Sequence, residues 1–211
     1  MSKVLNKSEA ERAAKYLTAA DAVLAPIIAA AGPCTIRQHQ NYYWELIDGI
    51  IGQQMSIKAA AAIERRFKEL FGTETPQPEA IVEKSIDDLR SVGLSRAKAS
   101  YIQDLAQHII DGKLKFDNFE SMSNDEIIQE LVAVKGIGEW TAHMFLMFCM
   151  ARTDILAVGD LGVRNAVKKL YGFDNIPTPD EVKLIAEQNN WHPYETAACW
   201  YLWKSSDNSP G

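Results

Sequence analysis

The sequence contains little cysteine and no long hydrophobic run. Its three cysteines, Cys34, Cys149 and Cys199, lie far apart in a chain of 211 residues. This number and spacing argue against a disulfide framework and against a zinc or iron–sulfur centre. We therefore expect reduced thiols, two of them buried in helices. No apolar stretch approaches the ~20 residues of a membrane span, and the first seven residues lack the apolar run of a signal peptide. A cytoplasmic location, or a nuclear one in a eukaryote, is expected.

The chain also lacks an excess of positive charge. Its 22 Lys and Arg residues are outnumbered by 28 Asp and Glu residues, for a formal net charge of −6. Nucleic-acid-binding proteins usually carry a basic excess, so this balance is typical of an ordinary acidic globular protein. DNA binding would require phosphate contacts from backbone N–H groups, or a local basic face. The candidate residues for such a face are Lys58, Arg65, Arg66, Arg96, Lys98, Arg164, Lys168 and Lys169.

The rest of the chain consists of helical segments separated by short breaks. No stretch shows the period-2 alternation of a half-buried strand, so we predict an all-α fold. Capping boxes and N-terminal prolines mark several helix starts. The predicted helices cover residues 8–20, 21–31, 41–51, 56–71, 78–84, 85–91, 96–111, 123–134, 139–150, 161–171, 178–190 and 193–203. The tail, residues 205–211, is expected to be disordered.

The most specific segment runs from Leu131 to Ala142. A helix ends, Gly136-Ile137-Gly138 turns the chain, and a second helix begins. Glycines permit positive φ and close backbone approach, and the first N–H groups of the second helix form an anion site. Such a hairpin can bind a phosphate without lysines. By itself the pattern is as typical of an αα-corner whose glycines only shape the turn.

A second motif follows about twenty residues after the hairpin, at Gly159-Asp160-Leu161-Gly162-Val163-Arg164. The two motifs together resemble the helix–hairpin–helix plus Gly/Pro-Asp signature of the DNA glycosylase superfamily. The similarity to its 3-methyladenine (AlkA-like) branch extends over about residues 42–204. Four shorter segments support it: residues 51–56, 93–98, 191–194 and 200–203.

The resemblance implies a two-lobed helical fold with the active-site cleft between the lobes. One lobe would contain about residues 45–150, with the helix–hairpin–helix at 131–142. The other would combine residues 1–44 with 151–204. The implied partner is double-stranded DNA with an alkylated base, bound by a monomer that has no membrane association.

The activity implied by the resemblance is base excision. An alkylated purine is flipped out of the duplex, and its N-glycosidic bond is hydrolysed to leave an abasic site. Trp140 stands where bifunctional members carry the lysine that forms a Schiff base, which predicts a monofunctional enzyme. No cofactor is expected. A structural K⁺ or Na⁺ at the hairpin, held by the backbone carbonyls of Val134 and Ile137, is also implied.

Asp160 is the expected catalytic carboxylate. Its position at the head of a helix favours an ionised side chain. A fixed carboxylate stabilises the positive charge that builds on the sugar as the bond to the base breaks, and it can position water. The alternative interpretation is a simple N-cap of the helix over residues 161–171.

The base pocket is expected to be aromatic. Electron-rich rings attract cationic alkylated bases through cation–π contacts, and the resemblance places Trp140 and Trp203 at the pocket wall. Tyr43 and Trp44 are further candidates. Most aromatics at helical spacing are core residues, and this alternative stays open for Trp140.

DNA contacts are assigned by the same resemblance. Gln54 matches the residue that intercalates where the base leaves the stack, and Met55 is expected in the core. Glu195 stands where the family motif has arginine, which puts one contact in doubt. The remaining candidates are Gln53, Ser56, Lys135, Gly136, Gly138, Thr141 and Arg164.

Two functions of other classes stay open at this point. The chain could be a non-catalytic helix–hairpin–helix DNA-binding module, or an all-helical protein-interaction domain with no role on DNA. A pure binding module needs neither Asp160 nor an aromatic pocket, and only the acidic charge favours the interaction domain.

Overall fold

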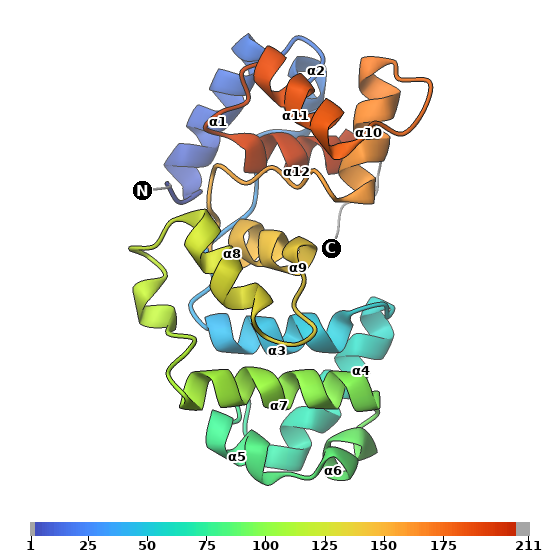
Figure 1. Cartoon of the computed structure of the whole chain (residues 1–211). Helices are drawn as coiled ribbons and strands as arrows, with labels where there is room; N and C mark the ends of the chain where they lie inside the picture. The colour runs from blue at the N-terminus through green and yellow to red at the C-terminus, as the bar shows by residue number, and fades with distance from the viewer. Residues whose placement is uncertain (1–2, 206–211) are drawn as a thin grey trace. The chain divides into compact units, whose positions relative to one another are not determined.

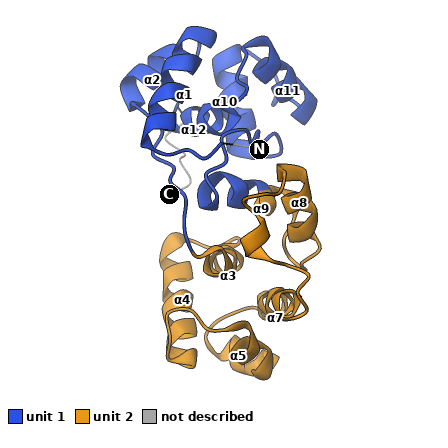
Figure 2. Cartoon of the chain, turned by 90° about the vertical axis from the view of Figure 1, so that its left-hand side faces the viewer, with its two compact units in different colours: residues 1–40, 143–211 blue, residues 41–142 orange. Residues whose placement is uncertain are grey.

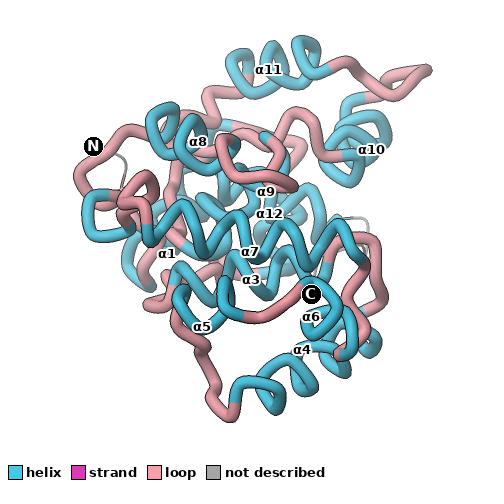
Figure 3. The backbone as a smooth tube through the Cα atoms, turned by 60° about the horizontal axis from the view of Figure 1, so that its bottom comes forward, coloured by secondary structure: helices cyan, strands magenta, loops and turns pink. Residues whose placement is uncertain are grey.

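The computed structural model describes residues 3–205. These residues form helices joined by short loops, with no β-strand among them and only a single β-bridge between Val4 and Arg152 (Figure 3). The prediction of an all-α fold is confirmed. Of the tail predicted to be disordered, Ser205 is instead the last residue of a helix, and residues 206–211 lie outside the described part.

The chain divides into two compact units (Figure 2). Unit 1 combines the two ends of the chain, residues 1–40 and 143–211, and unit 2 is the continuous segment 41–142. The resemblance predicts these divisions near residues 45 and 150.

Unit 1 is built around its last helix (Figure 1). Helix α12 (Glu195–Ser205) packs against α1 (Lys7–Ala20), α2 (Ala25–Ala31) and α10 (Leu161–Tyr171), and α10 contacts α11 (Pro179–Gln188). Every residue of α12 from Thr196 to Trp203 is buried. A helix that is covered on all sides forms the core of its unit, so α12 is the element that fixes α10 and its N-terminal residues.

Unit 2 is built around α7 (Arg96–Ile110), which packs against α3 (Tyr42–Gly52), α5 (Pro78–Glu83) and α6 (Ile86–Ser91). Helix α4 (Ile57–Phe71) packs on α3. A short 3₁₀ turn (Phe116–Asn118) leads to α8 (Asn124–Val132), which is followed by the hairpin and α9 (Glu139–Met144). In Figure 1, α3 and α7 lie side by side.

Most predicted helix ends lie within two residues of those in the structure, and three differences have structural consequences. The helix predicted over residues 21–31 begins only at Ala25. Asp21 leaves the helical path because its buried carboxylate accepts hydrogen bonds from the Val23 and Leu24 amides, the Tyr171 hydroxyl and the Trp191 indole. The last helix begins at Glu195 and not at Pro193. The helix predicted over 139–150 becomes a π-helix from Phe145 to Cys149.

The cysteines also differ from expectation. Cys199 is buried in α12, but Cys34 is buried in a loop, and Cys149 is only half-buried in the π-helix. One thiol, and not two, is therefore buried within a helix. All three cysteines are free thiols.

Candidate active site and DNA-contact loops

The hairpin after α8 depends on one glycine in particular. Gly136 has φ +82°, and a Cβ at this position would lie 2.1 Å from Cδ2 of the Tyr101 ring. Only glycine, among the amino acids, readily adopts this backbone conformation and also leaves room for so close a neighbour. Gly138 is different: its φ is not positive, and the space where a Cβ would stand is open. The expectation that both glycines serve positive φ is wrong for Gly138, whose open side leaves room for a ligand close to the backbone.

The start of the hairpin is anchored to α7 by Asp104. One carboxylate oxygen of Asp104 accepts the Lys135 amide at 2.9 Å. The Lys135 ammonium lies 3.2 Å from the other oxygen, and His108 Nδ1 lies 3.4 Å from the carboxylate. Burial opposes ionisation of Asp104, but the Lys135 amide, the Lys135 ammonium and His108 outweigh it and lower the Asp104 pKa. Lys135 thus holds the hairpin in place as well as being a predicted DNA contact.

The loop that follows α3 carries the predicted intercalating residue. Gln54 is exposed and has φ +54°, which is uncommon for a residue with a side chain. Gln53 donates from Nε2 to the Gly136 carbonyl at 2.9 Å. Lys98 donates from Nζ to the carbonyls of Ile51 and Gln53 at 2.8 and 2.6 Å. The loop is therefore tied both to α7 and to the hairpin.

The residues after Gln54 place apolar side chains at the surface. Met55 is 37% exposed and Ile57 is 80% exposed, so the expectation of Met55 in the core is wrong. Ser56 caps α4 by accepting the Ala59 amide at 3.3 Å. Apolar residues of this kind can wedge between DNA base steps, so Gln54 stands next to two further side chains suited to that contact.

Asp160 sits at the N-terminus of α10 in unit 1. One oxygen, Oδ1, accepts the Val163 amide at 2.9 Å and the Trp203 indole N–H at 2.9 Å. Asp160 is therefore the N-cap of α10, as the alternative interpretation held. Its hydrogen bond from the Trp203 indole, however, is not part of a helix cap. Two donors on one oxygen fix the orientation of the carboxylate plane, which is what a group that must face a developing charge requires.

Trp203 contributes to this arrangement from the core. Its side chain is only 2% exposed and stacks on Phe148, with ring centroids 5.5 Å apart and an interplanar angle of 28°. The resemblance predicts Trp203 at a pocket wall, but its hydrogen bond to Asp160 has no signal in the sequence.

Gly162 is the residue that sequence reasoning missed. A Cβ on Gly162 would lie 3.0 Å from Asp160 Oδ1 and 3.0 Å from Nε1 of Trp203. The position tolerates only glycine without displacement of the pair. The available signal was a glycine in the first turn of a helix, where its low helix propensity needs a reason.

The other predicted pocket aromatics differ in exposure. Trp140, the second residue of α9, is 51% exposed, which rules out the core-packing interpretation. Trp44 packs on Phe67 and has the Lys68 ammonium 4.7 Å from its ring centroid. Tyr43 is half-buried, its hydroxyl is buried without a hydrogen-bond partner, and burial together with Glu79 raises its pKa. Trp140 thus presents the most open aromatic face of the four candidates.

The local basic face is mostly committed to other contacts. Five of its eight candidate residues are held within the fold: Arg65 by Glu69, Arg96 by Asp87, and Arg66, Lys98 and Arg164 by backbone carbonyls. Arg164, a predicted DNA contact, donates from Nε to the Pro177 carbonyl at 2.7 Å. Arg65 and Arg96 make these ion pairs at the surface, whereas Arg66, Lys98 and Arg164 are tied to backbone carbonyls.

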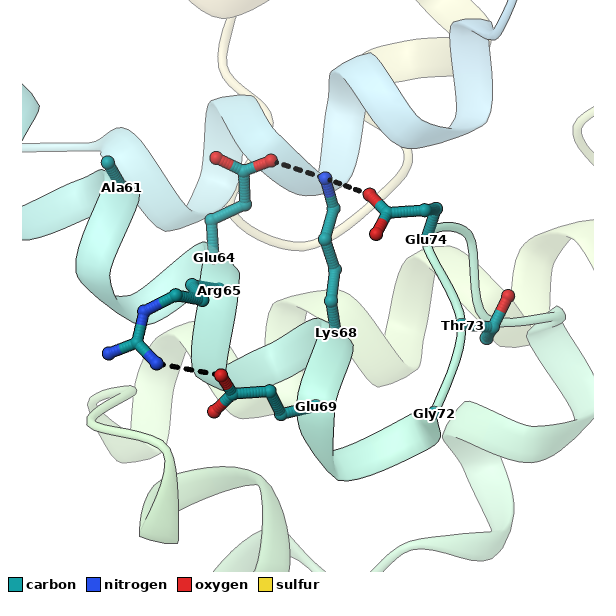
Figure 4. A pocket seen from close by; sticks show the side chains of 8 residues that line it. All are labelled: Ala61, Glu64, Arg65, Lys68, Glu69, Gly72, Thr73 and Glu74. Atoms are coloured by element: carbon teal, nitrogen blue, oxygen red, sulfur yellow. Dashed lines mark hydrogen bonds and ion pairs between the residues drawn. The ribbon is translucent and has the colours of Figure 1, made fainter.

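A surface hollow of about 600 Å³ lies along α4 and the turn after it, and Figure 4 shows the side chains that line it. The Lys68 ammonium lies 2.8 Å from a Glu64 oxygen and 2.9 Å from a Glu74 oxygen, and Arg65 pairs with Glu69 (Figure 4). Of the predicted residues, only Arg65 of the candidate basic face lines this hollow, and none of the predicted catalytic, base-pocket or hairpin residues does. Its charges satisfy one another, so it is not the predicted site.

Glu195 makes a local contact where the resembling family has arginine. Its Oε1 lies 2.9 Å from His192 Nδ1, across the cis His192–Pro193 bond, and its Oε2 is buried without a partner. Among residues 3–205, no helix has both the length and the apolar character to cross a membrane. The same residues include no cluster of three His, Cys, Asp or Glu side chains arranged for a metal.

Comparisons with known proteins agree with these features. The HhH-GPD superfamily of base excision DNA repair proteins matches residues 47–190. DNA-3-methyladenine glycosylase 1 of Schizosaccharomyces pombe is 36% identical over 166 residues, which are 78% of this chain and 72% of that protein.

Solved structures are similar over nearly the whole chain. A DNA-3-methyladenine glycosidase from Bacillus halodurans matches with a TM-score of 0.82 at 38% identity, covering 92% of this chain and 88% of its own. The 3-methyladenine DNA glycosylase of Schizosaccharomyces pombe in complex with abasic DNA matches with a TM-score of 0.80 at 33% identity, covering 93% and 97%. The chain belongs to the HhH-GPD superfamily of base excision DNA repair proteins.

Proposed function

We infer that this protein is a DNA-3-methyladenine glycosylase, an enzyme that hydrolyses the N-glycosidic bond of alkylated purines in double-stranded DNA. The observation that carries this function is the Asp160 carboxylate, held by the Val163 amide and the Trp203 indole at the head of α10. Its family relatives named above are glycosylases for the same class of base. A non-catalytic binding module would have no use for a carboxylate fixed in this way.

Asp160 acts on the sugar and on water. As the bond from C1′ to the base nitrogen breaks, its electron pair leaves with the base and positive charge develops on the deoxyribose. The ionised carboxylate stabilises that charge. A water molecule then forms a bond to C1′ and loses a proton, for which the Asp160 carboxylate is the proposed acceptor. The products are the free base and an abasic site.

Water is the proposed nucleophile because Trp140 offers no amine. A lysine at this position would form a Schiff base with the sugar and permit strand cleavage. The enzyme is therefore proposed to be monofunctional. This follows from the side chain at one position and not from the fold, which bifunctional and monofunctional members share.

Cationic purines such as 3-methyladenine and 7-methylguanine are the proposed substrates. They leave without protonation, because the departing electron pair neutralises the ring. The exposed Trp140 face suits them, since cation–π attraction is worth ~0.5–1 kcal/mol at an exposed site and about 2 kcal/mol when water is excluded. Trp203 contributes through its indole N–H, because its rings are covered.

The DNA duplex is held by backbone groups and a wedge. The amides at the start of α9 and the open side of Gly138 are proposed to receive a phosphate. Gln54, flanked by Met55 and Ile57, is proposed to fill the gap left by the flipped base. The relative solved with abasic DNA supports DNA as the partner. The protein would act as a monomer, in the cytoplasm of a prokaryote or the nucleus of a eukaryote.

A monovalent cation at the hairpin is a further part of the proposal. The Val134 carbonyl accepts the Ile137 amide at 3.1 Å, which leaves its oxygen a second lone pair. This lone pair and the Ile137 carbonyl are ligands suited to K⁺ or Na⁺, which would supply positive charge beside a bound phosphate. DNA affinity in potassium chloride, compared with N-methylglucamine chloride at equal ionic strength, tests the site.

The function is tested by mass detection of bases released from methylated duplex DNA under single-turnover conditions. Free 3-methyladenine and 7-methylguanine, with intact strands before alkali treatment, are the expected products. DNA binding without release of any base would leave only the non-catalytic binding module.

A further inference from the structure

One face of α7 contacts both of the proposed DNA-binding loops. Lys98, Tyr101, Asp104 and His108 follow one another at intervals of three, three and four residues. Side chains at this spacing share one face of a helix. We call these four residues the α7 stripe. All of its contacts lie within unit 2.

The N-terminal end of the stripe holds the Gln54 loop. Helix α3 ends at Gly52, and the last carbonyls of a helix have no partner within it. The Lys98 ammonium donates to two carbonyls in this region, those of Ile51 and Gln53. Burial lowers the pKa of Lys98, so this ammonium has given up water to make these contacts. Its charge positions the backbone next to Gln54 and is not directed at DNA phosphates.

The middle of the stripe holds the hairpin. The Tyr101 ring occupies the space beside Gly136 that any Cβ would need. Asp104 accepts the Lys135 amide and faces the Lys135 ammonium, while His108 lies behind it. The hairpin is thus held by one steric contact and one charged hydrogen bond from successive turns of the same helix.

The two loops are also joined to each other. Gln53, whose carbonyl accepts from Lys98, donates its side-chain amide to the Gly136 carbonyl. The path from Lys98 through Gln53 to Gly136, and back through Tyr101 to α7, is a closed ring of contacts. Neither loop can shift along α7 without breaking one of them.

We propose that the α7 stripe is a positioning device that sets the register between the intercalating Gln54 and the phosphate-binding hairpin, so that both engage one duplex at a fixed spacing. Lys98 is its principal positioning residue. This proposal rests on the proposed function, because it assigns both loops to DNA. It predicts that Gln54 can distinguish an abasic site from intact duplex only while Lys98 holds its loop.

The test is a double-mutant cycle on binding selectivity. Fluorescence anisotropy gives Kd for a duplex with a tetrahydrofuran abasic analogue and for the intact duplex, and their ratio is the selectivity. In the wild type, Gln54→Ala should reduce the selectivity about tenfold, a factor equal to ~1.4 kcal/mol. In the Lys98→Met background the same change should reduce it less than about twofold, since interacting sites are not additive.

Three further variants separate positioning from general stability. Lys98→Arg keeps a donor for both carbonyls and should recover most of the selectivity. If Lys98→Met fails to fold, Gln53→Met replaces it: this change removes the side-chain link to Gly136 and should also weaken the Gln54 effect. Lys113→Met, which removes an exposed ammonium paired with Asp111 just after α7, is the matched control and should leave the selectivity unchanged.

The wild-type protein should bind abasic DNA more tightly than intact duplex. If it does, and Gln54→Ala reduces the selectivity equally in the wild-type and Lys98→Met backgrounds, the positioning role of the α7 stripe is wrong. The proposed function is then unaffected. If Lys98→Met and Lys98→Arg weaken binding to abasic and to intact duplex by the same factor, the positioning role is also wrong. A wild-type protein with no preference for abasic DNA would instead overturn the function, and the stripe with it.

Discussion

The two proposed working parts of this enzyme are constructed in opposite ways. The DNA-contact loops of unit 2 present exposed side chains and open backbone, at Gln54, Ile57 and Gly138, over a helix that supplies the supports. The Asp160 site of unit 1 is a carboxylate pinned by a buried indole. The contrast follows from the different roles of the two parts, because a DNA grip must meet a ligand of varied sequence, whereas a catalytic group must hold one orientation.

The same contrast explains how a protein with a net negative charge could bind DNA. An acidic protein binds DNA poorly through side chains, and most candidate basic residues are already engaged within the fold. Backbone amides carry partial positive charge whatever the net charge of the protein. The proposed phosphate contact at the hairpin would therefore make DNA binding compatible with a formal charge of −6.

Of the substitutions on the two sides of this comparison that leave Asp160 in place, Gly162→Ala should reduce the rate of base release at the Asp160 site most. Gly162→Ala places a Cβ 3.0 Å from both Asp160 Oδ1 and Trp203 Nε1, so the two side chains must shift by a few tenths of an ångström. Misplacement of a catalytic group by ~1 Å can cost about 10²-fold in rate, and for this smaller shift we expect a loss of about tenfold or more in single-turnover base release. Affinity for abasic DNA should stay within about twofold of wild type.

The neighbouring Gly159 provides the control for this substitution. A Cβ on Gly159 meets nothing within 4 Å and its φ is not positive. Gly159→Ala should therefore retain most of the rate. Equal losses in the two variants would show that the loop backbone, and not the Asp160–Trp203 pair, is what Gly162 protects.

The hairpin side is tested by its two glycines. Gly136→Ala must adopt positive φ and displace the Tyr101 ring, which should lower the free energy of unfolding by about 2–4 kcal/mol. Gly138→Ala has room for its Cβ and should leave stability within ~0.5 kcal/mol while weakening DNA binding. Urea denaturation and DNA titration measure the two effects. If Gly138→Ala binds DNA as tightly as the wild type, the proposed phosphate contact at Gly138 is wrong.

Replacement of Trp203 by phenylalanine isolates the indole hydrogen bond. Trp203→Phe keeps an aromatic ring against Phe148 but deletes the donor to Asp160. A hydrogen bond to a charged group is worth about 1.5–3 kcal/mol, so base release should slow by about tenfold or more. The loss should be similar for cationic and neutral lesions. A loss confined to cationic bases would make Trp203 a cation-binding wall instead.

Salt dependence gives the smallest but most general effect. Each phosphate neutralised by a side chain adds about −0.9 to the slope of log K against log salt concentration. Because the grip is proposed to be mainly backbone, a slope of magnitude below about 3 is expected. A slope steeper than about −6 would mean that lysines and arginines, freed from their present partners, carry the binding.

The sequence was sufficient to predict the helices whose ends carry local signals. Capping boxes at Ser123 and Thr178 and the glycine after Phe71 lie where predicted. The capping box expected at Ser8 is wrong, because the first helix begins at Lys7 and Asn6 is its N-cap. It failed where a distant contact overrides local preference. The helix predicted to begin at Asp21 begins only at Ala25, because the Asp21 carboxylate is held by Tyr171 and Trp191 from far along the chain, and no local pattern contains those two contacts.

The candidate site was predictable to a similar extent. The motif identified Asp160 and the hairpin, because these residues are close in sequence. The bond from Trp203 to Asp160 joins residues 43 positions apart, and its dependence on Gly162 is a matter of packing. The exposure of Met55 was missed because an apolar residue beside a helix start suggests core, whereas here it belongs to a surface that is proposed to meet DNA.

The central claim is that Asp160 performs the chemistry while the rest of the molecule positions it. Asp160→Asn retains an N-cap acceptor for the Val163 amide and removes the charge. Under single-turnover conditions on methylated duplex DNA, release of 3-methyladenine and 7-methylguanine should fall by about 10³-fold, the upper range for loss of one preorganised electrostatic group. Thermal stability and affinity for abasic DNA should be retained. Release at a rate within tenfold of wild type would contradict the account, because the carboxylate would then be a helix cap and nothing more.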